Sequence, residues 1–250
     1  FEIGNELWGT VTPEVYANGY LKYYTAMKKV DPSIKVGLIL NTPEWNRRVL
    51  YVVKDKIDFG IIHVYPTPSW LKEDLENMEA KQIFEISLAL PVIQDEYNFQ
   101  ETLKILREKS GKEIPLAVTE YNGGFVQEKP VPYRYCLGTA LLNAELLRIF
   151  MKPQHNILIA NYWQFCNSYW GMVVNNAFDY KESSIYEPYL KRPNYYVLEF
   201  YYKHFGETLL DTNIKCKAYE VICYQPIKTL LPRLKTGTLI KKNLLSDKWV

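Results

Sequence analysis

The chain has 250 residues, of which 48% are hydrophobic and 23% are charged, enough apolar material for a sizeable core. Its 30 basic and 28 acidic residues leave a net charge of +2, so composition favours neither a nucleic acid nor a membrane surface as partner. Aromatic residues are frequent, with 21 Tyr, 10 Phe and 6 Trp, and they suit a packed core, a protein interface or flat platforms for sugar rings.

The four cysteines are scattered and form no C-x-x-C pair, which predicts buried free thiols rather than a disulfide framework. The three histidines lie far apart, so neither a metal ion nor another cofactor is predicted. The sequence contains no signal peptide, membrane-spanning apolar run or N-x-[ST] glycosylation site. Because Phe1 already lies inside a motif described below, we expect the natural N-terminus to lie upstream, which leaves cytoplasmic and secreted locations both open.

The first residues form a short apolar-leaning run that leads into Asn5 and Glu6, with Trp8 and Gly9 close behind. This pattern predicts a strand followed by a loop, with the Glu6 carboxylate at the point where the strand ends. An amide and a flat apolar ring would lie beside that carboxylate.

Two helix starts follow, and they share the order threonine, proline, glutamate. Thr12 and Thr42 are expected to cap helices, with proline in the first turn and a carboxylate near the positive end of the helix dipole. Each helix is followed by a short, uniformly apolar segment, which is typical of a buried strand. The predicted elements are a helix over residues 13–30, a strand over 35–40, a helix over 43–56 and a strand over 58–64.

The middle of the chain continues this alternation. A helical region over residues 70–90 and 95–109 is expected to be broken at Pro91, because proline lacks the amide that a helix interior needs. The elements predicted beyond it are a strand over 114–119, a helix over 133–151, a strand over 156–162 and a helix over 194–204.

Apolar strands that alternate with amphipathic helices predict an α/β fold with a parallel sheet and helices outside it. No Gly-rich turn follows any strand, so the spacing favours part of a (β/α)8 TIM barrel over a dinucleotide-binding sheet. From residue 207 the sequence pattern changes to short segments typical of strands with two different faces, at residues 208–210, 215–224 and 237–240. We therefore expect an incomplete catalytic barrel over residues 1–206 and the beginning of a C-terminal β-sandwich over 207–250.

Glu6 and Glu120 each follow a predicted strand, and each has an aromatic residue close behind. Hydrolysis of a glycoside with retention needs one carboxyl group to protonate the leaving oxygen and another to attack the anomeric carbon, with their oxygens roughly 5–5.5 Å apart. Two strand ends can face each other across the rim of a barrel. We therefore predict that these glutamates are the catalytic pair; the alternative is that each is a solvated loop residue.

Other polar and aromatic residues at strand ends are predicted to support this pair. His63 and Tyr65 lie two residues apart and so point to the same side, where Tyr65 could hydrogen-bond Glu120, although His63 alone also fits a core histidine. Asn5 and Gln164 could bind sugar hydroxyl groups or cap backbone groups instead. Five tryptophans are candidate sugar platforms, of which about two are expected to serve while the others pack: Trp8, Trp45, Trp70, Trp163 and Trp170.

The chain resembles clan A glycoside hydrolases, most closely family 51, the α-L-arabinofuranosidases. The resemblance covers about residues 1–225 and rests on four motifs and on the passage over residues 193–210. The motifs are Glu2-Ile3-Gly4-Asn5-Glu6, His63-Val64-Tyr65, Val118-Thr119-Glu120-Tyr121-Asn122 and Asn161-Tyr162-Trp163-Gln164. By this resemblance the chain holds strands four to eight of the barrel and lacks the first three. Tyr121 departs from the family, which commonly has tryptophan at that position.

The resemblance implies exo-hydrolysis of terminal α-L-arabinofuranosyl residues from an arabinose-containing oligo- or polysaccharide. Glu6 would be the general acid and base, Glu120 the nucleophile, Tyr65 the residue that orients the nucleophile, and Gln164 a sugar ligand. Two alternatives stay open: a clan A endo-glucanase or β-xylosidase, and an inactive carbohydrate-binding remnant of such a barrel. No nucleic acid or membrane partner is expected, and a homo-oligomer is left open.

Overall fold

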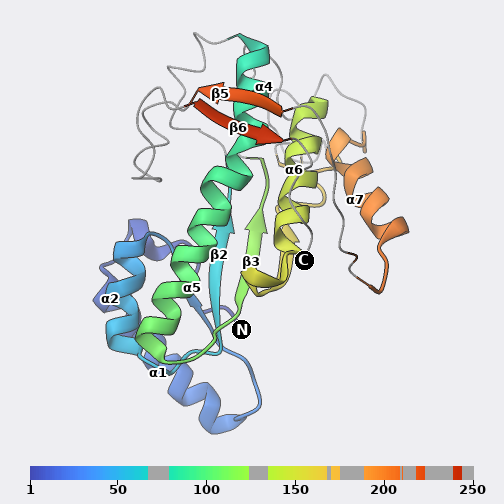
Figure 1. Cartoon of the computed structure of the whole chain (residues 1–250). Helices are drawn as coiled ribbons and strands as arrows, with labels where there is room; N and C mark the ends of the chain where they lie inside the picture. Colours follow the sequence, from blue (N-terminus) through green and yellow to red (C-terminus); the bar gives the residue numbers. More distant parts are fainter. Residues whose placement is uncertain are drawn as a thin grey trace. The chain divides into compact units, whose positions relative to one another are not determined.

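The computed structural model describes residues 1–66, 79–123, 135–167, 170–174, 189–208, 210, 218–222 and 239–243. The chain divides into two compact units that are interleaved in sequence, as the colours of Figure 1 allow the reader to follow. The first unit comprises Phe1–Val64, Asn98–Tyr121 and Pro153–Asn161. The second unit comprises Tyr65–Tyr97, Asn122–Lys152 and Tyr162–Val250.

In the first unit, the two predicted threonine caps are confirmed. The side chain of Thr12 accepts a hydrogen bond from the Val15 amide at 3.4 Å and begins α1 (Pro13–Val30). Thr42 accepts from the Trp45 amide at 3.2 Å and begins α2 (Pro43–Val53). Each cap satisfies an amide that the first helical turn leaves without a partner. The two helices lie side by side (Figure 1).

A parallel sheet forms the centre of this unit, as the alternation of elements predicts. Its strands follow one another in chain order: β1 (Gly37–Ile39), β2 (Phe59–Val64), β3 (Leu116–Tyr121) and β4 (Ile157–Tyr162). The pairs β1–β2 and β2–β3 are parallel. The sheet is extended at β1, because Glu2 forms a parallel bridge with Gly37, whose amide donates to the Phe1 carbonyl at 2.7 Å.

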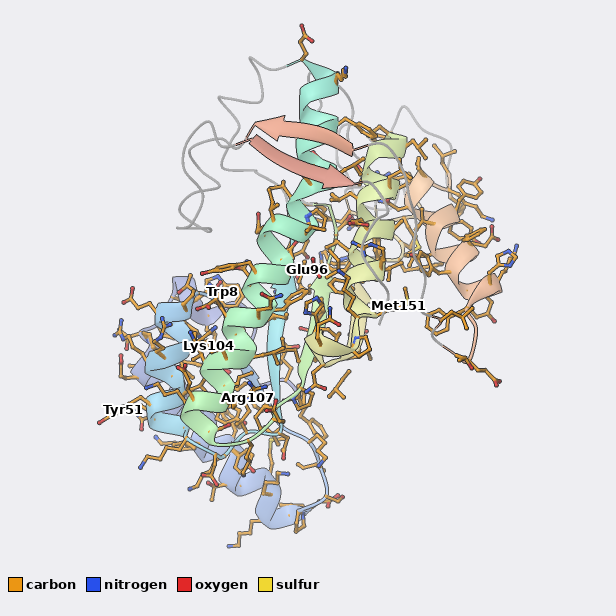
Figure 2. The ribbon with its side chains drawn as sticks, viewed as in Figure 1. Trp8, Tyr51, Glu96, Lys104, Arg107 and Met151 are labelled. Carbon is orange, nitrogen blue, oxygen red and sulfur yellow. The ribbon has the colours of Figure 1, made fainter. Side chains whose placement is uncertain are left out.

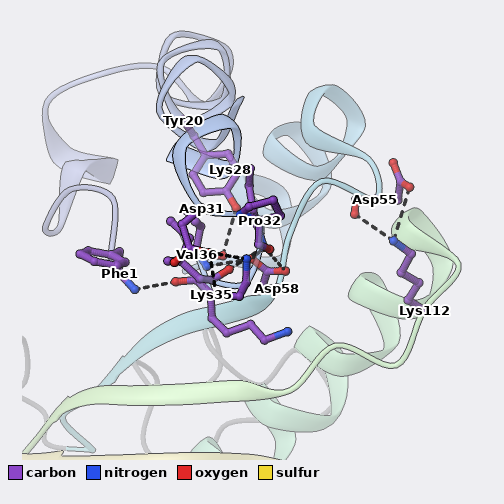
Figure 3. A network of polar contacts seen from close by, with 12 residues as sticks. Phe1, Tyr20, Lys28, Asp31, Pro32, Lys35, Val36, Asp55, Asp58 and Lys112 are labelled. Atoms are coloured by element: carbon purple, nitrogen blue, oxygen red, sulfur yellow. Dashed lines mark hydrogen bonds and ion pairs between the residues drawn. The ribbon is translucent and has the colours of Figure 1, made fainter. Parts of the chain in front are cut away.

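A polar network closes the end of the sheet at which β1 and β2 begin (Figure 3). The ammonium group of Lys28 lies 2.9 Å from a carboxylate oxygen of Asp58 and donates to the Ile34 carbonyl at 2.6 Å. The same carboxylate accepts from the Val36 amide at 2.8 Å. Lys28 and Asp58 are both largely buried, so the ion pair is less screened than a surface pair and joins α1 to the start of both strands.

The α-helix is interrupted at Pro91 as predicted, but the segment that follows is π-helical rather than a break. The chain stays helical through α4 (Ala80–Leu90), the π-helical segment η3 (Pro91–Glu96) and α5 (Tyr97–Ser110). Proline cannot donate a backbone hydrogen bond, and its ring crowds the preceding turn of an α-helix. Here Pro91 is the first residue of a segment with wider π turns, so the irregularity is absorbed without ending the helical region.

The second unit contains α4, α6 (Leu137–Phe150) and α7 (Pro193–His204), with α6 packed against both other helices. A buried polar network holds its strand ends and helices together. Asn143 donates to the side-chain oxygens of Asn122 and Asn194, at 3.4 and 3.2 Å, and the Tyr162 hydroxyl bonds to both of those asparagines. Hydrogen bonds of this kind offset the cost of burying polar groups, although the Asn143 side-chain oxygen itself accepts none from the described residues.

Two antiparallel strands, β5 (Ala218–Ile222) and β6 (Leu239–Asn243), lie in the C-terminal region after residue 207, where short strands are predicted. They agree with short strands there, while the remainder of the predicted β-sandwich lies outside the described residues. The predicted boundary at residues 206 and 207 stays a prediction. None of the described helices is both long and apolar enough to cross a membrane.

Candidate active site

The segment that carries Glu6 is fastened to β1 by a buried tyrosine. The hydroxyl group of Tyr16 donates to the Ile3 carbonyl at 3.0 Å and accepts from the Ile39 amide at 2.8 Å. Burial raises the pKa of Tyr16 well above the ordinary value for a phenol, so this hydroxyl keeps its proton and remains a donor. One side chain from α1 thus links the first residues of the chain to the sheet.

Trp45 belongs to this support and is not a sugar platform. Its ring stacks on Tyr16, with centroids 5.7 Å apart, and its indole N–H donates to the Ile39 carbonyl at 3.1 Å. The side chain is buried, so no face is open to a sugar. The prediction that some of the five tryptophans would pack holds for this one.

The backbone at Glu6 has an uncommon conformation. Its φ and ψ angles are 48° and 39°, in the left-handed region, and a short 3-10 turn over Leu7–Gly9 follows directly. A non-glycine residue in that region costs on the order of 1 kcal/mol, and such positions concentrate at functional sites. Gly4, with φ of 90°, makes the approach possible, because a Cβ atom there would lie 2.7 Å from the Leu7 side chain.

A bulge in β3 decides which way Glu120 points. Ile62 pairs with Val118, but the next residue of β2, His63, pairs with Glu120, so Thr119 is the extra residue. Partners in a parallel pair lie on the same face of the sheet, and successive residues alternate between faces. The bulge therefore places the side chain of Glu120 on the His63 face, where regular pairing would place Thr119.

These local features bring Glu6, His63 and Glu120 together. Nδ1 of His63 lies 2.8 Å from a carboxylate oxygen of Glu6 and 3.5 Å from one of Glu120. The three polar atoms all lie within 4.8 Å of one another. This upper limit lies nearer to the roughly 5–5.5 Å between the carboxylates of retaining glycosidases than to the about 6.5–9.5 Å of inverting enzymes.

The two carboxylates have different surroundings. The side chain of Glu6 is 45% exposed, while that of Glu120 is 15% exposed. Water and a leaving group can therefore reach Glu6, whereas Glu120 is more enclosed. This difference in exposure suits a reaction in which one carboxyl group exchanges protons with solvent while the other attacks a carbon atom.

His63 lies at the centre of the cluster. Burial of its ring, which is 5% exposed, acts to lower its pKa, but the nearby Glu2 carboxylate, the hydrogen bond to Glu6 and the charges of Glu120 and Glu6 prevail and raise it. These carboxylates thus stabilise the protonated form of the ring. The indole of Trp8, labelled in Figure 2, meets the His63 ring edge-on with centroids 5.8 Å apart.

The same three groups, two carboxylates and one imidazole, are also of the kinds that ligate metal ions. Nδ1 of His63 is hydrogen-bonded to Glu6 at 2.8 Å, so a metal ion bound there would have to replace this hydrogen bond and its proton.

The other predicted site residues fall into two sets. Asn5 directly precedes Glu6 in the first unit and is exposed. Tyr65, Trp163 and Gln164 belong to the second unit, and their predicted roles toward the glutamates stay predictions. Within that unit the ring of Tyr65 lies 6.0 Å from that of Trp170, and the Trp163 carbonyl accepts from Asn122 at 2.7 Å. Trp70 lies outside the described residues.

Sequence reasoning missed the contact of Glu2 with this site. A carboxylate oxygen of Glu2 lies 3.8 Å from Nε2 of His63. The sequence offered one indication of this contact. Glu2 lies four residues before Glu6, and in an extended strand two residues an even number apart point to the same face. Its neighbour His63, however, is 61 residues further along the chain, and no local pattern links the two.

No family model matches the chain. A curated β-xylosidase from Geobacillus stearothermophilus is 26% identical over 188 residues, which cover 71% of this chain and 35% of that protein. Among solved structures, a family 51 α-L-arabinofuranosidase from Bifidobacterium longum matches 89% of this chain and 48% of its own, with a TM-score of 0.67 and 16% identity. A monomeric β-xylosidase from Caulobacter crescentus matches 98% of this chain and 43% of its own, with a TM-score of 0.54 and 14% identity.

These similarities agree on the fold. The chain has the clan A glycoside hydrolase fold, and its parallel α/β part matches part of such a barrel. It spans about a third of the curated relative and about half of the arabinofuranosidase structure. Arabinofuranosidases and xylosidases both appear among the similar proteins.

Proposed function

We propose that this chain, which has the clan A glycoside hydrolase fold, carries the catalytic pair of a retaining glycoside hydrolase. The observation that carries the proposal is the closeness of the Glu6 and Glu120 carboxylates, whose nearest oxygens lie within 4.8 Å. That separation leaves no room for a water molecule beside the sugar on the far side of the scissile bond, so direct attack by a carboxylate is the mechanism that fits.

The mechanism assigns one carboxylate to each side of the scissile bond. In the first step Glu6 donates a proton to the glycosidic oxygen while a Glu120 oxygen attacks the anomeric carbon, the carbon–oxygen bond breaks, and an alcohol leaves. In the second step Glu6, now a carboxylate, takes a proton from water, and the water oxygen displaces Glu120 from the anomeric carbon. Two inversions give net retention.

For the substrate, we propose a terminal α-L-arabinofuranosyl residue. The motifs around Glu6 and Glu120 and the similarity to a family 51 α-L-arabinofuranosidase structure support this choice. A β-xylosyl substrate is the second candidate, because the curated relative is a β-xylosidase. A clan A endo-glucanase activity and a non-catalytic carbohydrate-binding function remain the further alternatives.

The test uses aryl glycosides of arabinofuranose, xylose and glucose with the complete protein. We expect turnover of the arabinofuranoside, with the first product released in the same anomeric configuration as the substrate. Glu120→Ala should lower kcat by at least about 10³-fold. Glu6→Ala should slow substrates with poor leaving groups far more than an activated aryl glycoside, because only the former need the proton.

Different failures point to different alternatives. Turnover of the xyloside alone would transfer the proposal to β-xylosidase. An inverted first product would contradict the double displacement. Binding of the sugar without turnover of any glycoside would support the carbohydrate-binding alternative, and an equal loss on both leaving groups in Glu6→Ala would remove the acid role from that residue.

A further inference from the structure

Three carboxylates approach the ring of His63, and only two of them belong to the proposed double displacement. Glu6 and Glu120 both lie on the side of Nδ1, at 2.8 and 3.5 Å. Glu2 lies on the opposite side of the ring, 3.8 Å from Nε2. The imidazole thus stands between Glu2 and the catalytic pair, and the two ring nitrogens face different partners.

The backbone places Glu2 there. Glu2 bridges to Gly37 in parallel, and Gly37 pairs with Phe59 at the start of β2. Partners share a face of the sheet, and alternation along β2 then puts Phe59, Ile61 and His63 on the same face as Glu2. Its side chain is 27% exposed and its backbone is held by the bridge to Gly37, so Glu2 differs from a carboxylate on a free chain end.

We propose that Glu2 is a positioning residue that acts through His63 and keeps a proton on the Glu6–His63 pair. The inference rests on the proposed function, because it assumes that Glu6 is the general acid. A negative charge beside Nε2 stabilises the imidazolium, and Nδ1 of the same ring shares its proton with Glu6 across 2.8 Å. His63 also faces Glu120, so Glu2, Glu6 and Glu120 are the charged groups that together set its titration.

The proton balance of the first reaction step follows from this arrangement. Before the step, the Glu6–His63 pair holds one proton. As the leaving oxygen takes a proton from Glu6, the proton on Nδ1 can move along the hydrogen bond, so that the pair ends as a carboxylate and a neutral imidazole. In the second step the proton released by water returns to the pair. Glu2 exchanges no proton with the substrate in either step.

The experiment compares Glu2→Gln, which removes the charge at nearly constant shape, with Glu2→Asp, which keeps it. Glu14→Gln is the matched control, because Glu14 lies in the same unit but pairs with Arg48 across α1 and α2. The first measurement is an NMR titration of the His63 ring in the complete protein without substrate. The chain has three histidines, so the His63 signal is assigned by its loss in His63→Gln.

In Glu2→Gln we expect the His63 ring to titrate about 1 pH unit lower than in the unsubstituted protein, as expected for loss of one nearby opposite charge. Glu2→Asp should restore most of the shift, and Glu14→Gln should not change it. The second measurement is kcat/KM against pH. Its fall at high pH should move to lower pH in Glu2→Gln for a poor leaving group, and should stay in place for an activated aryl glycoside.

An unshifted His63 ring in Glu2→Gln would overturn the inference even in an active enzyme. A shifted ring with an unchanged pH profile on the poor leaving group would also overturn it, because the coupling would then be irrelevant to the acid. A shifted ring in a protein that hydrolyses none of the three glycosides would instead overturn the proposed function, so the two failures are distinguishable.

Discussion

The side chain of His63 is nearly buried, yet the neighbouring carboxylates raise its pKa. Burial of an imidazole in low dielectric favours the neutral ring, and each carboxylate within hydrogen-bonding reach works in the opposite direction. In this site the carboxylates prevail and the pKa of His63 is raised. The ring thus stays protonated to a higher pH than an ordinary imidazole does.

The raised pKa makes a contribution to folding stability that depends on pH. It is fully present below the unfolded-state value of about 6.5 and is lost as pH rises through the folded-state pKa. We expect His63→Gln to lower the free energy of unfolding by roughly 1 kcal/mol at pH 6, and by clearly less at pH 9, measured by urea unfolding.

The control for this experiment is His204→Gln, because His204 is exposed at the end of α7 in the second unit. Its effect should be small at both pH values. A loss for His63→Gln that is the same at pH 6 and pH 9 would contradict the assignment of the charge to His63.

At the level of single residues, the sequence predicted Glu6 and Glu120 as a pair because each follows an apolar strand. It did not predict that His63 would stand between them. The contact with Glu120 depends on the bulge in β3. A strand buried on both faces is apolar throughout, so its sequence shows no alternation from which a bulge could be recognised. Glu2 was missed for a related reason, because its partner lies on another strand.

Among the elements, β1 is the one that joins the Glu6 segment to the rest of the sheet, and it does so through a glycine. A Cβ atom added at Gly37 would lie 2.3 Å from the Phe59 ring and 2.6 Å from the Ile61 side chain. The sheet is therefore closely packed at the point where the first residues of the chain pair with it.

Gly37→Ala should destabilise the protein by about 1–3 kcal/mol, because Phe59 and Ile61 must shift to admit the methyl group. The measurement is the midpoint of thermal or urea unfolding. Gly19→Ala in α1 is the control, since a Cβ atom there meets nothing within 4 Å and alanine favours a helix by up to about 1 kcal/mol. A stabilising effect at both glycines would contradict the close packing at Gly37.

Local chemistry predicted most of the elements. The repeated Thr-Pro-Glu starts predicted both caps, and the apolar runs predicted four strands, each of which the structure confirms with slightly different ends. The further strand predicted before Glu6 is wrong, because Glu2 forms only an isolated bridge there. The end of the α-helix at Pro91 was predicted, but the π-helical segment that continues from it was not, because residue types do not specify such a turn. The helix expected from residue 133 begins at Leu137 among the described residues.

Across the whole molecule, the sheet presents apolar residues on its last described strand. Leu158 and Ile159 of β4 are neighbours in sequence and are 62% and 52% exposed. β4 is the final strand in the sheet order found in the described part of the chain. An exposed, apolar strand at the edge of a sheet is a template for pairing with another chain.

We expect the 250-residue chain to self-associate with rising concentration, and Leu158→Lys to reduce this association, as measured by sedimentation velocity. Val30→Lys is the control, because Val30 is also exposed and apolar but ends a helix. An equal reduction by both substitutions would show that net charge rather than the strand edge is responsible.

The parallel arrangement of the sheet followed from the alternation of strands and helices, but the division into two interleaved units did not. That division depends on which distant segments pack together, and each unit gathers three separate stretches of the chain. The predicted residues Tyr65, Trp163 and Gln164 consequently fall in a different unit from the glutamates that they were expected to serve.

The bulge at Thr119 has a consequence for how such a site tolerates changes in chain length. Insertion of one residue into a strand ordinarily reverses every side chain that follows, which would turn a carboxylate such as that of Glu120 to the other face of the sheet. Here the additional residue is looped out of the ladder directly before Glu120, and pairing resumes with the carboxylate on the His63 face. A bulge at this one position therefore lets β3 hold an additional residue while the side chain of Glu120 stays on the His63 face.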